Sequence, residues 1–172
     1  MKRLSIAGII CALLVAGAVW ANRATDALPA EARADLIVVE KGKRTLTLYK
    51  SGVVLRSYSV ALGRGMTGAK EHERDNRTPE GRYSIDSRNA QSAFHRALHV
   101  SYPSAADRAR ARAAGFEPGG DVMIHGMRNG FGWLGRAHRL FDWTRGCIAV
   151  TNDEIDEIWR VVPDGTPIEI KP

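Results

Sequence analysis

Short apolar segments separated by turns follow one another along most of the chain, a pattern typical of a mainly β protein. The apolar segment 36–39 and the alternating segment 45–49 flank a Lys-Gly-Lys turn, and a Ser-Gly turn leads into a third apolar segment at 53–62. We expect these three segments to form a β-meander. Further short strands are predicted at 81–85, 97–101, 121–124, 147–150 and 167–170.

Two segments carry the signals of helices. Ser104 and Asp107 have the spacing of a capping box, and Gly115 is a natural stop for the helix that they would begin. Thr151 and Glu154 form a second capping box. The residues after it fall at helical spacing and define one apolar face: Ile155, Ile158, Trp159 and Val162. The pattern therefore predicts a single mainly β domain with two short helices.

The segment 63–80 lies between two predicted strands and has no apolar periodicity. It is rich in Gly, Arg, Lys, Glu and Asn, so we expect it to be a long exposed loop. Loops of this length inside a compact domain are commonly functional or disordered. The segment is therefore a candidate part of the functional site.

The first 21 residues differ from the rest and have the layout of a secretory signal peptide. A positively charged start precedes an uncharged apolar stretch at 4–19, and Ala21 ends a candidate cleavage site. The apolar stretch is shorter than the ~20 residues that a spanning helix needs, although an uncleaved anchor would have a similar composition. We expect an exported protein of the periplasm or cell envelope with three parts: a signal peptide or anchor at 1–21, a short linker at 22–34 and one folded domain at 35–172.

The composition fits one globular domain and narrows the choice of partners. The chain has 172 residues, 44% of them hydrophobic and 26% charged, which excludes a disordered tail, a fibre and a multi-span membrane protein. A net charge of +6 indicates an acidic partner such as the cell wall, nucleic acid or a membrane surface. Nucleic acid is disfavoured because no aromatic-rich binding strand accompanies the arginines and because export removes the protein from it. Membrane contact is expected only through an uncleaved N-terminus.

The cysteine count singles out one residue. Signal cleavage would remove Cys11 and leave Cys147, and an unpaired thiol in an oxidising compartment is a liability unless it is buried or used. A nucleophilic thiol needs a histidine base within hydrogen-bond reach. His125 follows an apolar strand and precedes Gly126, which would let a substrate backbone approach. Gly146 permits a tight turn that can aim backbone amides at a developing oxyanion.

Other interpretations of the same residues stay open at this point. A single cysteine is more often a small buried hydrophobic residue than a nucleophile, and His125 can be a purely structural histidine. His138 is a second candidate base. The spacings of a zinc site, such as Cys-x-x-Cys or His-x-x-x-His, are missing from the sequence, so we expect no metal.

Several motifs in order resemble the L,D-transpeptidase catalytic domain of the YkuD type. That family has a His-Gly pair, a gap of variable length and then Ser/Thr-x-Gly-Cys before an aliphatic residue. Here these are His125-Gly126 and the Thr-Arg-Gly-Cys-Ile run at 144–148. The Thr-Pro-Glu-Gly segment at 78–81 and the Gly-Gly-Asp-Val-Met-Ile-His-Gly run at 119–126 also resemble family segments. The resemblance extends from about residue 35 to residue 170.

The resemblance implies a β-sandwich-like fold with a cleft where His125 and Cys147 meet, and an enzyme that acts on peptidoglycan stem peptides. Cys147 would attack as a thiolate whose pKa an adjacent histidine lowers, and His125 would be the base. The thioester would pass to the amine of a second stem in a 3→3 cross-link, or to a wall-linked lipoprotein, a D-amino acid or water. No metal or organic cofactor is implied.

Supporting roles in the oxyanion hole or in substrate binding are expected for six residues. Many family members have histidine where this chain has Arg145, and arginine where it has Ala149, so Arg145 is a candidate for holding a substrate carboxylate. The six residues are Gly146, Arg145, Gly126, Thr144, Tyr83 and Arg77.

Two alternative functions fit the same sequence. The Gly-Cys-Ile-Ala-Val-Thr-Asn run at 146–152 resembles a branch in which some members hydrolyse bonds. A thiol hydrolase or amidase that cleaves peptidoglycan or protein–peptidoglycan bonds is therefore one alternative. A non-catalytic wall-binding module is the other, and it predicts that Cys147→Ala changes nothing.

Overall fold

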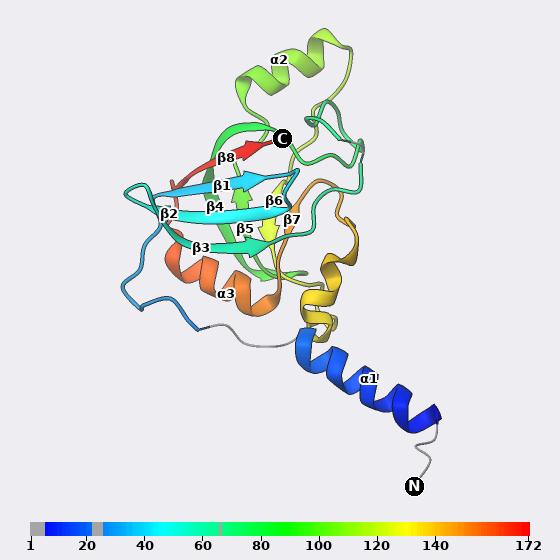
Figure 1. Ribbon diagram of the computed structural model, residues 1–172. Helices are drawn as coiled ribbons and strands as arrows, with labels where there is room; N and C mark the ends of the chain where they lie inside the picture. Colours follow the sequence, from blue (N-terminus) through cyan, green and yellow to red (C-terminus); the bar gives the residue numbers. More distant parts are fainter. Residues whose placement is uncertain (1–5, 22–25, 66) are drawn as a thin grey trace, which may run out of the picture.

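Eight strands and four helices make up the fold of the computed structural model, which describes residues 6–21, 26–65 and 67–172 (Figure 1). The strands are β1 Leu36–Glu40, β2 Thr45–Lys50, β3 Val53–Ser59, β4 Gly81–Ser92, β5 His95–Val100, β6 Met123–His125, β7 Ile148–Ala149 and β8 Pro167–Lys171. The helices are α1 Ile6–Ala21, α2 Ala105–Ala113, the 3-10 helix η1 Gly132–Leu140 and α3 Asn152–Val161.

The strands form a single curled sheet in the order β3-β2-β1-β8-β4-β5-β6-β7. The meander β1-β2-β3 is antiparallel, as its two short turns require. β8 joins β1 in parallel and β4 in antiparallel orientation, so the C-terminal strand links the meander to the rest of the sheet. The prediction of a mainly β domain is confirmed, and each predicted strand is present in the structure.

Both predicted helices are present, each with its capping box. Ser104 and Asp107 cap α2, and Thr151 and Glu154 cap α3, by reciprocal side-chain and backbone hydrogen bonds. Helix α3 covers one face of the sheet, where Ile155 and Ile158 are fully buried in the core. Helix η1, in the gap between His125 and Cys147, was not predicted because its nine residues contain two glycines and no apolar periodicity.

The segment expected to be a linker lies against α3 where the structure describes it, from residue 26 onward. The Leu28 amide donates to Glu157 Oε1 at 2.7 Å, and the Ala34 amide donates to the Val161 carbonyl at 2.8 Å. Ala34 is buried in the core. Residues 28–34 therefore contribute contacts to the domain.

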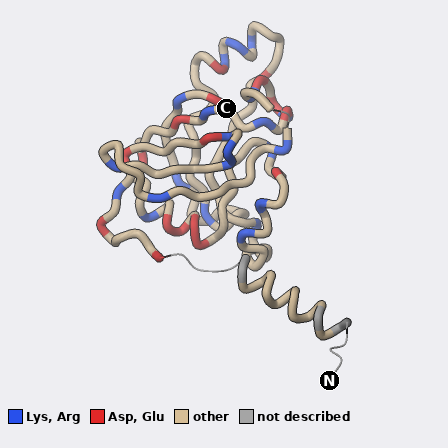
Figure 2. The backbone as a smooth tube through the Cα atoms, viewed as in Figure 1, with Lys and Arg blue, Asp and Glu red and all other residues tan. Residues whose placement is uncertain are grey.

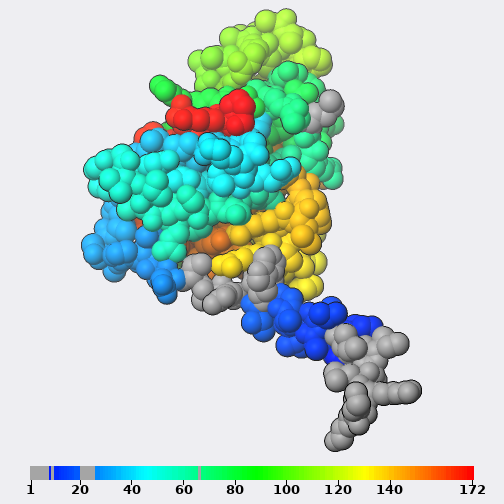
Figure 3. Space-filling model, in the orientation of Figure 1, coloured from blue at the N-terminus to red at the C-terminus, as the bar shows by residue number. Residues whose placement is uncertain are grey.

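Helix α1 projects away from the sheet in Figure 1. None of the helices that the structure describes is long and apolar enough to cross a bilayer. Acidic positions gather along α3 at the bottom of Figure 2, whereas basic positions are spread over the rest of the tube. In the space-filling view, η1 (yellow) lies along the lower edge of β3 (teal) (Figure 3).

Candidate active site

The two predicted catalytic residues lie on neighbouring parallel strands. His125 ends β6, and Cys147 directly precedes β7. The register pairs Ile124 with Ile148 and His125 with Ala149. Because side chains alternate along a strand, Cys147 and His125 belong to the same face, two residues apart along the strands and one strand apart across them. The fold therefore sets these two residues at adjacent strands, although the whole of η1 separates them in the sequence.

The turn before Cys147 is held by its own hydrogen bonds. Thr144 Oγ1 donates to the Cys147 carbonyl at 2.7 Å and accepts from the Gly146 amide at 3.1 Å. Gly146 has a φ of +124°, and a Cβ at this position would lie 2.7 Å from the Arg77 carbonyl oxygen. Glycine is therefore required here both by the backbone conformation and by the close approach of the 63–80 loop.

The Cys147 thiol is half-buried beside the start of β6. Its Sγ donates to the Asp121 carbonyl at 3.5 Å. Burial raises the pKa of the Cys147 thiol, and the Asp121 carboxylate adds to that effect. The Met123 amide and the Lys70 ammonium act in the opposite direction but do not outweigh burial. The expectation of a thiol pKa lowered by its surroundings is therefore not met in this structure.

His125 is buried and held in one tautomer. Its Nδ1 lies 2.7 Å from the Gly126 carbonyl oxygen, and a carbonyl can only accept, so Nδ1 carries the proton and Nε2 keeps its lone pair. The ring contacts Phe94 at 4.6 Å and Trp143 at 5.8 Å between centroids. Burial lowers the pKa of His125, although its bond to the Gly126 carbonyl partly offsets this. At neutral pH the site therefore holds a neutral thiol and a neutral imidazole that can accept a proton at Nε2.

His138 does not meet the requirements of a second base in this structure. It is buried, and burial together with the Arg139 charge lowers its pKa to about 4. Its Nδ1 accepts a hydrogen bond from Trp143 Nε1 at 3.4 Å. Because an indole N–H can only donate, the imidazole proton lies on Nε2, and neither nitrogen has a free lone pair.

The 63–80 loop forms a wall against the Cys147 turn and is less exposed than expected. Lys70 and Asp75 form an ion pair at 2.7 Å in which both side chains are 5% exposed. Asp75 also accepts hydrogen bonds from three backbone amides of the loop. Thr78 Oγ1 accepts from the Gly63 amide at 3.0 Å. These bonds fold the loop back on itself and satisfy Lys70, Asp75 and Thr78 within the protein.

Three of the expected supporting residues, Gly126, Thr144 and Tyr83, make packing or hydrogen-bond contacts within the fold. A Cβ at Gly126 would lie 2.8 Å from Asn152 Oδ1, so glycine here allows close packing on α3. Thr144 is buried within the turn. Tyr83 of β4 is buried against α2, and its hydroxyl donates to Asp107 Oδ2 at 3.1 Å. Burial raises the pKa of the Tyr83 hydroxyl.

The three remaining expected residues are Arg77, Gly146 and Arg145, and they differ in whether their polar groups are already bonded within the protein. The Arg77 side chain is turned into its own loop, where it pairs with Glu71 at 3.2 Å, and its carbonyl contacts the turn at Gly146. The Gly146 amide is already bonded to Thr144 Oγ1, so it is not free for an oxyanion. Arg145 is exposed and has no bonded partner among the residues that the structure describes.

Residues 34–170 match the family described as YkuD, the L,D-transpeptidase catalytic domain. The chain belongs to this family. "Putative L,D-transpeptidase YafK" of Escherichia coli strain K12 is 34% identical over 132 residues, which make up 73% of this chain and 46% of YafK. "Putative L,D-transpeptidase YqjB" of Bacillus subtilis strain 168 is 27% identical over 136 residues, which make up 78% of this chain and 69% of YqjB. The chain thus spans about half the length of YafK.

Solved structures share the fold of this chain. The helical cell shape determining protein Pgp2 of Campylobacter jejuni superposes with a TM-score of 0.61 at 22% identity, over 91% of this chain and 56% of Pgp2. Bd1075 of Bdellovibrio bacteriovorus superposes with a TM-score of 0.54 at 25% identity, over 84% of this chain and 53% of Bd1075.

The surroundings of the thiol in this L,D-transpeptidase domain contain residues that sequence reasoning missed. Asp121 follows two glycines and adopts a φ of +53°, a conformation that aspartate tolerates better than most residues. Its place after two glycines, at the first residue of the predicted strand 121–124, was a usable signal. Lys70 and Phe94 gave no such signal, because a lysine in a polar loop and a phenylalanine in a hairpin are unremarkable until the chain is folded.

Proposed function

We propose that the protein is an exported cysteine L,D-transpeptidase that acts on peptidoglycan stem peptides. The observation that carries the proposal is the pairing of β6 with β7, which places a tautomer-fixed His125 and the Cys147 thiol on one face of the sheet. Membership of the L,D-transpeptidase family supports the choice of substrate. No step of the reaction that we propose needs a metal or a cofactor.

The acylation step starts from the neutral pair. His125 Nε2 takes the thiol proton as Cys147 Sγ attacks a peptide carbonyl carbon of the donor stem. The C–S bond forms, the C–N bond breaks, and His125 returns the proton to the leaving amine. We assign stabilisation of the oxyanion to the backbone amides of Cys147 and Arg145, since the Gly146 amide is engaged by Thr144.

The deacylation step transfers the acyl group to an amine acceptor. The acceptor nitrogen attacks the thioester carbon while His125 accepts its proton, and the C–S bond breaks to regenerate the Cys147 thiol. A diaminopimelate side chain of a second stem would give a 3→3 cross-link. A lipoprotein lysine or a free D-amino acid would give a related product. Export by the N-terminal segment is part of the proposal, supported by its charged start and apolar stretch.

A hydrolase is a second candidate because a groove lies beside the two residues whose backbone groups contact the Cys147 sulfur. The groove has a volume of ≈ 520 Å³, and Asp121 and Met123, both neighbours of the Cys147 sulfur, line it. Water that reaches the thioester from this side would cleave the stem or a protein–peptidoglycan bond instead of forming a cross-link. The residues and the first step are the same in both functions.

The test uses the full chain, its Cys147→Ala variant and the Cys11→Ala variant as the matched control for loss of a thiol outside the site. Each protein is incubated with muropeptide monomers and cross-linked dimers, and the products are identified by mass spectrometry. New dimers that require Cys147 and persist with Cys11→Ala would support the transpeptidase. Truncated stems or lost cross-links would support the hydrolase, and identical mixtures for all three proteins would favour the wall-binding module.

A further inference from the structure

The groove beside the Cys147 thiol extends over β4, β5 and β6, which are neighbouring strands of the sheet (Figure 1). Two of the residues that line it contact the sulfur itself. The Asp121 carbonyl accepts from Cys147 Sγ at 3.5 Å, and the Met123 amide donates to the same sulfur. The groove volume of ≈ 520 Å³ is within the range of small-molecule sites. We call this feature the Asp121 groove.

The register of the strands shows that the floor of the Asp121 groove continues the face of the sheet that carries the nucleophile. Met123 lies next to Cys147, and His99 of β5 pairs with Met123. Ser87 of β4 pairs in turn with His99. Side chains of directly opposed residues point to the same face of a sheet. At ~4.8 Å between strands, the groove floor reaches about 10 Å from Cys147 to His99.

A β-bulge turns another carboxylate toward the groove. The register between β4 and β5 shifts between Ile85 and Ser87, which leaves Asp86 as the extra residue. Bulges of this kind redirect a side chain. Asp86 Oδ1 lies 2.6 Å from His99 Nδ1, so the Asp86 carboxylate already has a partner within the groove.

The carboxylate of Asp121 has no such partner. Asp121 is exposed, and its carboxylate makes no hydrogen bond or ion pair with any residue that the structure describes. Two nearby cations are bound elsewhere, since Lys70 pairs with Asp75 and Arg88 pairs with Asp164. The Asp121 carboxylate is also close enough to the sulfur to raise the pKa of the thiol. The groove therefore has a free negative charge next to the reacting atom.

A free carboxylate at this place is suited to a cationic ligand, because a charge-assisted hydrogen bond to an ammonium is stronger than one between neutral groups. The deacylation step needs a primary amine beside the thioester. An alkyl amine such as that of lysine has a pKa of about 10.4 and is therefore an ammonium at neutral pH. The charge of the acceptor thus matches the charge of the groove.

We propose that the Asp121 carboxylate binds the ammonium group of the acceptor stem and holds it beside the Cys147 thioester. The inference rests on the proposed function for the identity of the acceptor. The ammonium loses one proton to water, and the neutral amine then attacks the thioester carbon. The C–N bond forms, the C–S bond breaks, and the second proton passes through His125 to the Cys147 sulfur. Asp121 is then a specificity-determining residue that favours an amine over water.

The test measures how the thioester divides between competing nucleophiles, so that a change in the rate of acylation does not affect the result. The full chain is incubated with a purified stem tetrapeptide, which serves as donor and acceptor, and with hydroxylamine, which is uncharged at about pH 7.5. Mass spectrometry gives the amounts of dimer, hydroxamate and hydrolysed stem. Asp121→Asn removes the charge and keeps a residue that tolerates the positive φ of this position. Asp26→Asn is the matched control, because Asp26 is exposed and only its backbone carbonyl is bonded.

We expect Asp121→Asn to lower the ratio of dimer to hydroxamate about fivefold. Asp26→Asn should change this ratio less than about twofold. Added salt should lower the ratio for the unsubstituted protein and leave it unchanged for Asp121→Asn, because salt screens the attraction between exposed charges. Equal losses of dimer and hydroxamate, a change no greater than that of the control, or hydrolysis without any dimer would overturn the proposal.

A second measurement separates the acceptor from the donor as the source of the ammonium. The rate of thioester formation is compared for the tetrapeptide and for the same peptide with its side-chain amine acetylated. If Asp121→Asn slows acylation by the first peptide and not by the second, the groove binds the donor and the proposal is wrong. An equal effect on both peptides, together with the lower ratio of dimer to hydroxamate, supports the acceptor.

A binding measurement separates failure of this inference from failure of the proposed function. The two peptides are titrated by NMR against the full chain carrying Cys147→Ala, with and without Asp121→Asn. Tighter binding of the free amine that depends on Asp121, in a protein that forms no thioester when Cys147 is present, would reject the proposed function and keep the groove as an ammonium site. Binding that does not depend on Asp121 would overturn the inference whether or not a thioester forms.

Discussion

Two connecting segments, the 63–80 loop and helix η1, flank the turn before Cys147, and they differ in how fully their polar groups are hydrogen-bonded. The 63–80 loop is tied together by the buried Lys70–Asp75 pair and by hydrogen bonds to three of its amides. Helix η1 is interrupted at Gly135, and among the described residues it holds both buried polar atoms that lack a partner. Apolar side chains are exposed on η1 and beside it: Phe131, Trp133, Leu140 and Phe141.

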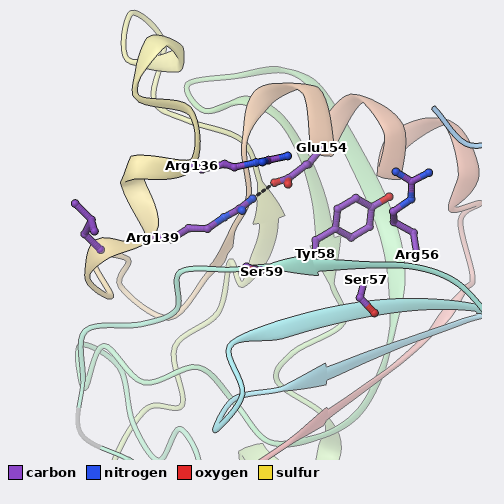
Figure 4. Close-up of a pocket in the computed structure, with 8 residues that line it drawn as sticks. Arg56, Ser57, Tyr58, Ser59, Arg136, Arg139 and Glu154 are labelled. Atoms are coloured by element: carbon purple, nitrogen blue, oxygen red, sulfur yellow. Dashed lines mark hydrogen bonds and ion pairs between the residues drawn. The ribbon is translucent and has the colours of Figure 1, made fainter. Parts of the chain in front are cut away.

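We infer that the 63–80 loop is held rigidly and that η1 can adjust its conformation. We call the 63–80 loop the fixed wall and helix η1 the adjustable wall. The 63–80 loop contacts Gly146 directly and therefore helps to set the position of the neighbouring Cys147 thiol. Helix η1 lines a pocket of ≈ 490 Å³ together with β3 and the first turn of α3 (Figure 4). Segments with unsatisfied donors and exposed apolar groups are held less firmly than fully bonded ones. Four predictions test whether the two segments differ in this way.

The largest effect on the free energy of unfolding is expected for Gly146→Ala, where the turn before Cys147 contacts the fixed wall. The new Cβ would lie 2.7 Å from the Arg77 carbonyl at a φ of +124°, so we expect a loss of at least about 3 kcal/mol in the free energy of unfolding. Gly130→Ala is the matched control, because its φ is +87° and a Cβ there meets nothing within 4 Å. It should cost about 1 kcal/mol. Urea unfolding measures both, and similar losses would contradict the tight contact at Gly146.

The next effect is expected for Asp75→Asn, which leaves the Lys70 ammonium buried and unpaired. We expect a loss of about 3 kcal/mol, against less than about 0.5 kcal/mol for the exposed control Glu73→Gln. Burial alone would raise the pKa of Asp75, but bonds from Lys70 and three amides outweigh it and hold the pKa below its ordinary value. The Asp75 contribution is therefore present above pH ~4 and lost as the carboxylate is protonated. The unfolding free energy of Asp75→Asn should lack this acid-dependent part.

How far the sequence predicts these features depends on the range of the interactions. The β pattern, both capping boxes and the candidate pair Cys147 and His125 follow from local signals, because periodicity and motifs are encoded over a few residues. The Lys70–Asp75 pair and the packing role of Gly126 depend on segments that meet only in three dimensions. The raised pKa of Cys147 comes from burial, which no local pattern around a cysteine reveals.

A smaller effect is expected for His138→Gln in the adjustable wall, on the decrease of the free energy of unfolding as the pH is lowered. Folded His138 stays neutral down to about pH 4, whereas in the unfolded chain it takes up a proton near 6.5. The unfolded state therefore binds more protons between these values, and stability falls as the pH drops through this range. His138→Gln should remove about 1–2 kcal/mol of the loss between pH 7 and pH 5. His125, whose pKa burial also lowers, contributes to both proteins, so an unchanged pH dependence would show that His138 is not held neutral.

The smallest effect is expected for Leu140→Ser at the end of η1. Leu140 is 82% exposed, and Leu62, which leads into the 63–80 loop, is 4% exposed. Replacing Leu140 should change the free energy of unfolding by less than about 0.5 kcal/mol. Leu62→Ser removes a fully packed side chain and should cost about 3 kcal/mol. A loss above ~1 kcal/mol for Leu140→Ser would mean that η1 is packed as firmly as the loop. Helix η1 would then not be the adjustable wall, because a firmly packed segment is held in place as strongly as a fully bonded one.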